Sequence, residues 1–197
     1  MAGQEWVPAG EESGRSLRAN LGMMMTRTAP WEVWHESSSK RRLGMAVFYS
    51  FHYQEDAWRV QQIMNMGVVD GQQINSQSWE TVKRQGERAI RNWIDNEMKY
   101  KSAVIVLNGT YTAGRPWVQY EIRRAWEIRK PLLAIDINGL KDREGHIDLQ
   151  GKNPFSCIGD FESMLIPWHQ PDGTSQQIYS QIKENLQMWA TQGYKKS

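Results

Sequence analysis

The pattern of hydrophobic and polar positions changes abruptly at Met45. From there, short apolar runs alternate with segments in which apolar residues recur every three or four positions. The short runs predict strands, and the segments with helical spacing predict amphipathic helices. The clearest run is "SAVIVLNG", where five consecutive apolar residues end at Asn108-Gly109. The predicted strands are 45–51, 67–71, 102–109, 131–137 and 163–168, and the predicted helices are 55–66, 79–98, 115–126 and 175–193.

This alternation predicts an α/β fold with a doubly wound parallel sheet and helices on both faces. The compact domain should span residues 45–197. Residues 1–44 have poor periodicity, so we expect an irregular or disordered N-terminal extension. The stretch 139–155 is rich in Gly, Asp, Lys and Asn, so it should form a surface loop.

Ligands in such sheets bind at the carboxyl ends of the strands, near a switch in strand order. Three segments converge there: Ser50-Phe51-His52 after the first strand, the polar loop 70–78, and residues 108–115 after the 102–109 strand. The last leads into a predicted helix that carries Trp117 and Glu121. These two residues are four apart, so they should lie on the same side of the helix. We therefore expect a site that includes Ser50, Phe51, His52, Trp117 and Glu121.

Composition narrows the classes of function. A formal net charge of +2 argues against a dedicated nucleic-acid binder. No apolar run is long enough to span a membrane, and we see no secretory signal. Cys157 is the single cysteine, which excludes an intrachain disulfide and suits a reducing, cytoplasmic setting. The four histidines lack metal-ligand spacing, and the usual dinucleotide and P-loop motifs are absent, so we expect no metal and no cofactor.

Five segments in order carry a resemblance to a known family. They are "SFHYQ" at 50–54, "SWE" at 78–80, "VLNGTYT" at 106–112, "WVQYEI" at 117–122, and "INGLKDREG" with "GKNPF" between 137 and 155. Over residues 45–160 the chain resembles TIR domains, and in particular the TIR-like proteins of the bacterial Thoeris anti-phage defence system. The resemblance implies a flavodoxin-like fold.

The resemblance also implies an activity. Many TIR domains cleave NAD at the bond between nicotinamide and ribose, using a glutamate that matches Glu121. NAD would then be a substrate rather than a cofactor, and the ADP-ribose part would become a signalling nucleotide, often cyclic. A separate effector protein would sense that product.

Several alternatives stay open. Glu121 could be a surface residue paired with Arg124, and Trp117 could anchor the core. Arg59 could form a surface ion pair or reach a phosphate, and Asn108 could form a turn or contact ligand. The whole domain could also be a non-catalytic interaction module. The product isomer, the activating trigger and the formation of a homo-oligomer are not determined by the sequence.

Overall fold

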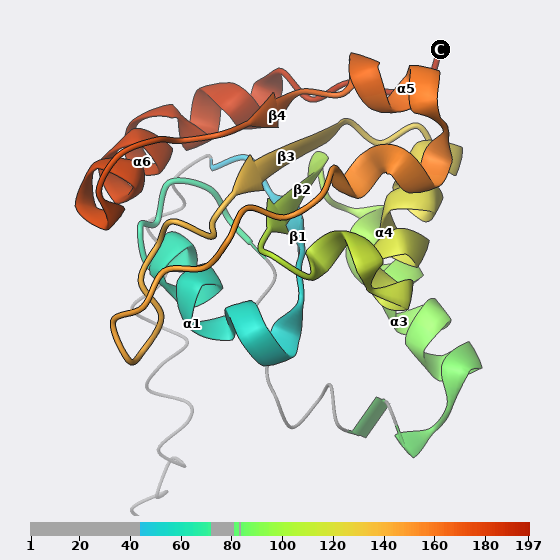
Figure 1. The fold of residues 1–197 in the computed structure, drawn as a ribbon. Coiled ribbons are helices and arrows are strands. Elements are labelled where there is room, and N and C mark those ends of the chain that lie inside the picture. Colours follow the sequence, from blue (N-terminus) through green and yellow to red (C-terminus); the bar gives the residue numbers. More distant parts are fainter. Residues whose placement is uncertain (1–43, 72–80, 83) are drawn as a thin grey trace, which may run out of the picture. The chain divides into compact units, whose positions relative to one another are not determined.

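A parallel β-sheet forms the centre of the domain. The computed structural model describes residues 44–71, 81–82 and 84–197. Its strands are β1 (Val47–Ser50), β2 (Ala103–Asn108), β3 (Leu132–Asp136) and β4 (Trp168–His169), in the order β1-β2-β3-β4 (Figure 1). Every residue of β1, β2 and β3 is buried, as expected for a parallel sheet covered on both faces.

The order in which the chain adds strands to the sheet reverses at β1. The predicted strand 67–71 is reduced to a single parallel bridge between Ala46 and Asp70. The Val47 amide donates to the Asp70 carbonyl at 2.9 Å, on the side of β1 away from β2. The chain therefore runs first to one side of β1 and then to the other, which is the flavodoxin-like order. Ligands bind at such a reversal, here beside the carboxyl ends of β1 and β2.

Helices cover both faces of the sheet, which confirms the predicted fold class. Helices α1 (Tyr53–Met64) and α6 (Ser175–Thr191) pack on one face, over a core that includes Tyr49, Ile105 and Ile135. Helices α3 (Glu87–Lys99) and α4 (Pro116–Glu127) pack on the other, over Phe48 and Val106 (Figure 1). No described helix has the length and apolar character needed to cross a membrane.

Two predicted elements differ from the structure. The helix predicted over 79–98 is interrupted, because Gly86 has a φ of 89° that a continuous helix cannot contain. Helix α3 starts after it. The strand predicted over 163–168 is wrong for its first half. Residues up to Leu165 belong to a short helix, α5 (Asp160–Leu165), and pairing with β3 begins only at Trp168.

Most of the stretch 139–155 is a surface loop, as predicted, and its last two residues begin the 3-10 helix η3 (Pro154–Ile158). It passes over the carboxyl ends of β2 and β3. The Asn108 side-chain amide donates to the Lys152 carbonyl at 3.3 Å. A Cβ on Gly151 would stand 2.2 Å from the Gly109 carbonyl oxygen, so the absence of a side chain at Gly151 allows the two backbones to approach this closely.

Two sequence predictions fall mostly outside the described residues. Residues 1–43, most of the predicted N-terminal extension, are not described, and neither are residues 72–80 of the polar loop. The predicted domain start near Met45 therefore stays a prediction.

Candidate active site

A pocket of about 220 Å³ opens at the carboxyl edge of the sheet, between the starts of α1 and α4. Helix α1 follows β1 almost directly. Helix α4 follows β2 after a short turn that contains the 3-10 helix η2 (Thr112–Gly114). The first residues of both helices therefore face the same space. The lining includes Phe51, His52, Gln54, Arg115, Trp117 and Glu121.

Glu121 is the buried acid of this pocket. Its residue is 8% exposed, and its Oε2 accepts a hydrogen bond of 2.5 Å from the Ser50 hydroxyl at the end of β1. Burial raises the pKa of Glu121 from 4.5 to about 8, and the Ser50 hydrogen bond opposes that rise. The carboxyl group is therefore largely protonated at neutral pH in the empty pocket.

The interpretation of Glu121 as a surface residue paired with Arg124 is wrong. Arg124 instead pairs with Asp95 at 3.0 Å and with Glu127 at 3.6 Å, on the outer side of the helix. The buried positions of α4 are Val118, Glu121, Ile122 and Ala125. Their spacing is that of a helix face turned to the core, so Glu121 occupies a position where an apolar residue would be usual.

Aromatic side chains form the walls around Glu121. Trp117 and Phe51 both line the pocket, and both are partly buried. The Trp117 indole lies edge-on to the Tyr120 ring, with 6.0 Å between ring centroids. Trp117 and Glu121 thus share one side of the helix, as their spacing predicts. Such walls favour a planar ring in the pocket.

His52 is buried at the entrance to α1. Among the described residues, its Nδ1 finds no hydrogen-bond partner. Burial, together with the nearby Arg115 charge, lowers the pKa of the imidazole, while Glu55 opposes that change. A neutral ring with an unpaired buried nitrogen can bond to a polar group of a ligand.

Sequence reasoning missed Arg115 and Gln54. Arg115 precedes Pro116 at the first turn of α4, and its Nε is buried with no partner in the described part of the chain. Gln54 lies in the first turn of α1. The signal for Arg115 was its place just before a helix-starting proline, where free backbone amides and a cation together favour an anion.

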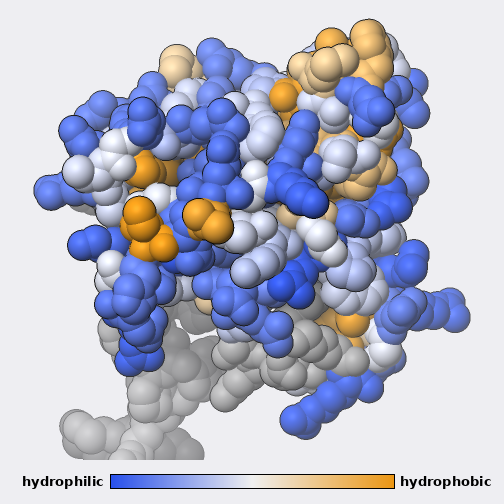
Figure 2. Space-filling view, viewed as in Figure 1, coloured by the Kyte–Doolittle hydropathy of each residue, from blue (hydrophilic) through white to orange (hydrophobic). Residues whose placement is uncertain are grey.

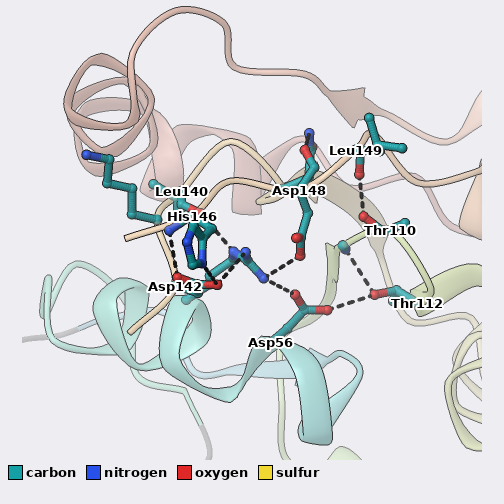
Figure 3. A network of polar contacts seen from close by, with 12 residues as sticks. Asp56, Thr110, Thr112, Leu140, Asp142, His146, Asp148 and Leu149 are labelled. Atoms are coloured by element: carbon teal, nitrogen blue, oxygen red, sulfur yellow. Dashed lines mark hydrogen bonds and ion pairs between the residues drawn. The ribbon is translucent and has the colours of Figure 1, made fainter. Parts of the chain in front are cut away.

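Arg59 does not line this pocket. It is 1% exposed, so the expectation of a surface ion pair is wrong. Its guanidinium contacts Asp56 at 3.2 Å and Asp148 at 2.8 Å, and its Nε donates to the Leu140 carbonyl at 2.8 Å (Figure 3). Arg59 thus fastens the 139–155 loop to α1.

Asp56 is the innermost acid of that network. Its second oxygen accepts a hydrogen bond from the Thr112 hydroxyl at 3.3 Å, which links α1 to the turn after β2. Burial raises the pKa of Asp56 to about 6, and Arg59 opposes the rise. Thr110 also donates to the Leu149 carbonyl (Figure 3).

Asn108 also lies outside the pocket lining. Its side-chain amide donates to Asp136 at 2.8 Å and to the Lys152 carbonyl, and the residue is fully buried. Gln150 and Trp168 donate to the same Asp136 carboxylate, at 2.9 and 2.7 Å. In this structure Asn108 therefore joins β2 to β3 and to the loop, and it does not contribute to the pocket around Glu121.

The site combines the Glu121 carboxyl group with aromatic walls. The Arg115 cation and the amino ends of α1 and α4 lie nearby. Within the described ranges, no group of three or more His, Cys, Asp or Glu residues could hold a metal ion. A planar base could enter beside Trp117 and Phe51. The Glu121 carboxyl group would then lie near the atom to which that base is bonded, where it could interact with a developing charge.

The four-stranded parallel sheet with helices on both faces is the architecture of a TIR-like α/β domain. Residues 48–142 match the family described as "Thoeris protein ThsB, TIR-like domain". A curated protein of Bacillus cereus (strain MSX-D12), named "Putative cyclic ADP-D-ribose synthase ThsB1", is 34% identical over 119 residues. That similarity covers 57% of this chain and 62% of the relative, so the chain matches less than two thirds of that protein's length. Residues 48–142, just under half of the chain, thus resemble the TIR-like domain of Thoeris proteins.

Proposed function

We propose that this protein cleaves NAD, releases nicotinamide, and makes a cyclic signalling nucleotide from the ADP-ribose part in anti-phage defence. The observation that carries the proposal is Glu121, a buried acid held by Ser50 in a pocket with aromatic walls. The name of the Bacillus cereus relative, a cyclic ADP-D-ribose synthase, supports the same reaction class.

The reaction breaks the bond between ribose C1′ and the nicotinamide nitrogen. The electron pair of that bond stays on the nitrogen, so nicotinamide leaves as a neutral base and positive charge develops at C1′. An ionised Glu121 beside C1′ would stabilise that charge more in the transition state than in the ground state. It could also accept hydrogen bonds from the ribose hydroxyls.

The protonation of Glu121 couples binding to ionisation. The carboxyl group of the empty pocket holds a proton at neutral pH, since burial raises its pKa to about 8. The nicotinamide ring of NAD is a cation, and a nearby positive charge favours the ionised carboxylate. Binding should therefore release the proton and create the charge that the reaction needs.

The second step decides the product. An adenine nitrogen of the same molecule adds to C1′ and the base then loses a proton, which closes a ring. Addition of water, which also loses a proton, would give ADP-ribose instead. The half-buried Trp117 and Phe51 could exclude water from C1′ and so favour the ring closure. His52 could meet the nicotinamide carboxamide through its unpaired Nδ1.

The proposal also specifies the substrate, a partner protein and the cellular location. NAD is the substrate, with no further cofactor, and the product would be sensed by a separate effector protein in the cytoplasm. A homo-oligomer could form without changing this chemistry.

The test is to incubate purified protein with NAD and to follow nicotinamide release and the nucleotide product by chromatography and mass spectrometry. Glu121→Gln should reduce turnover about 10²–10³-fold, since one strong electrostatic contact is lost. Glu127→Gln, on the exposed end of the same helix, is the matched control and should keep full activity. A Glu121→Gln variant that releases nicotinamide at the wild-type rate would exclude Glu121 as the catalytic residue.

Because purified protein could need a phage trigger, the same variants should also be expressed in infected cells. Nucleotide extracts then report product formation under the conditions in which a trigger is present. A cyclic product with wild type, but not with Glu121→Gln, would support the proposal in the setting where it should operate.

One observation favours a second candidate, a non-catalytic interaction module. Phe161 and Met164 on α5 are 67% and 75% exposed. Figure 2 shows hydrophobic side chains gathered on the surface where α5 lies in Figure 1. Exposed apolar groups of this kind often mark protein contacts. If NAD is never cleaved, even in infected cells, this candidate becomes the better one.

A further inference from the structure

The pocket around Glu121 is too small for a whole dinucleotide. Its volume is about 220 Å³, whereas sites that enclose drug-sized ligands typically measure ~300–1,000 Å³. With nicotinamide and its ribose beside Glu121, the adenosine half of NAD has to lie elsewhere on the surface.

A second hollow of about 580 Å³ adjoins this pocket. It lies between the outer side of α1 and residues 142–144 of the surface loop. Gln54 lines both the pocket and this hollow, so the two share a border at the first turn of α1. We call the second hollow the α1 groove; its lining includes Gln54, Glu55, Trp58, Asp142, Arg143 and Glu144.

Trp58 offers a flat surface in the α1 groove. It is 50% exposed, whereas Val60 and Ile63 of the same helix form the contact with the core. The fold thus leaves this indole at the surface, one turn from Gln54. An exposed indole in a groove can stack on a purine.

The two walls of the α1 groove are fixed to one another. The buried Arg59 guanidinium on α1 bonds to Asp148 and to the Leu140 carbonyl, on either side of the 142–144 wall (Figure 3). Gln62 of α1 donates to the Lys141 carbonyl at 2.8 Å. The groove is therefore formed before a ligand arrives, which lowers the entropic cost of binding.

The charges of the groove suit a nucleoside rather than a phosphate. Glu55, Asp142 and Glu144 outnumber the single cation, Arg143. Carboxylates accept hydrogen bonds from ribose hydroxyls but repel phosphates. The diphosphate would then sit at the border between the hollows, near Arg115 and the free amides at the start of α1.

We propose that the α1 groove binds the adenosine half of the dinucleotide before the nicotinamide bond breaks, with the adenine stacked on Trp58. The adenine then has to leave Trp58 to reach C1′ for the ring closure. The inference rests on the proposed function for its choice of NAD as ligand. Arg59 then acts as a positioning residue, since it sets the distance between the two walls without touching the ligand.

The test measures ADP-ribose binding by calorimetry and NAD cleavage by steady-state kinetics, on the same set of variants. Trp58→Ala should weaken ADP-ribose binding roughly tenfold and raise the KM for NAD by a similar factor, with kcat nearly unchanged. Trp58→Phe should retain most of the affinity, because it keeps a stacking ring. Tyr100→Ala is the control: Tyr100 is also an exposed aromatic residue, at 79% against 50% for Trp58, but it precedes the amino end of β2.

The outcomes separate the two proposals. If ADP-ribose binds and depends on Trp58 while NAD is cleaved neither by the purified protein nor in infected cells, the groove assignment stands and the proposed reaction is wrong. If NAD is cleaved with a KM and an ADP-ribose affinity that Trp58→Ala leaves unchanged, the groove assignment is overturned and the reaction stands. An absence of ADP-ribose binding by the wild-type protein would also overturn the groove assignment.

Discussion

Replacing Glu121 with Gln should make the protein more stable at alkaline pH. The substitution keeps the shape of the side chain and removes a charge that burial disfavours. The pKa of Glu121 is about 8 in the folded protein, against an ordinary value of 4.5. The folded state therefore holds a proton more tightly than the unfolded chain does. This contribution to stability is fully present below pH 4.5 and is lost as the pH rises through 8.

The magnitude follows from the size of that shift. The pKa rises by 8 − 4.5 = 3.5 units, and each unit corresponds to about 1.4 kcal/mol, so the full loss is about 5 kcal/mol. At pH 7 about 3 kcal/mol of this stabilisation is already lost, because pH 7 lies 7 − 4.5 = 2.5 pH units above the ordinary pKa. Gln cannot ionise, so the unfolding free energy of the variant does not include this pH-dependent loss. A sequence-based view of Glu121 as partly exposed predicts little change in stability, and the observed burial overturns that view.

The assay is urea unfolding of both proteins between pH 5 and pH 9, followed by tryptophan fluorescence. Asp56 and the other titrating groups are common to both proteins and cancel in the difference of unfolding free energies. That difference should shift in favour of the variant by several kcal/mol across the range, with most of the change between pH 5 and pH 8. A difference that stays constant within the error of the measurement would refute the assignment of a raised pKa to Glu121.

Two further predictions follow from the same structure. For NAD cleavage, kcat/KM should rise about tenfold per pH unit below 8 and level off above it, because this ratio reports ionisation in the free enzyme; a flat profile between pH 6 and pH 8 would contradict this. Arg59→Met should lower the free energy of unfolding by about 3–5 kcal/mol, because it leaves Asp56 buried and unpaired. The control Arg91→Met removes an exposed pair with Glu87 and should cost under about 1 kcal/mol, so equal losses would refute the role of the buried network.

The strands of the sheet were predictable where burial was complete. The runs that form β1, β2 and β3 are apolar on both faces, so their pattern has few alternatives. The run ending at Trp168 was misleading because its residues Met164 and Leu165 lie on α5 and are exposed. On α5, therefore, an apolar residue in the sequence does not indicate a buried position in the core.

The candidate site was predictable to the level of its location and its acid. The rule for parallel sheets brought Ser50, His52 and Glu121 to one edge without any knowledge of side-chain contacts. The burial of Glu121 carried a signal in its spacing from Val118, Ile122 and Ala125. The place of Arg59 carried none, because its partners other than Asp56 lie more than 80 residues away along the chain, in a loop without periodicity.

The contact between Gly109 and Gly151 sets the limits within which the surface loop can vary among related sequences. A side chain at either position would need space already taken, by the Asp56 carboxylate at 2.3 Å from a Cβ on Gly109, or by the Gly109 carbonyl at 2.2 Å from one on Gly151. The residues from 143 to 150 are exposed, and the clear constraints among them are Gly145, with a φ of 91°, and Asp148, which pairs with Arg59. Homologues can thus diverge in the length and composition of the loop's middle, whereas the two glycines should be retained. A family could in this way alter one wall of the α1 groove while the sheet and the acid beneath it stay unchanged.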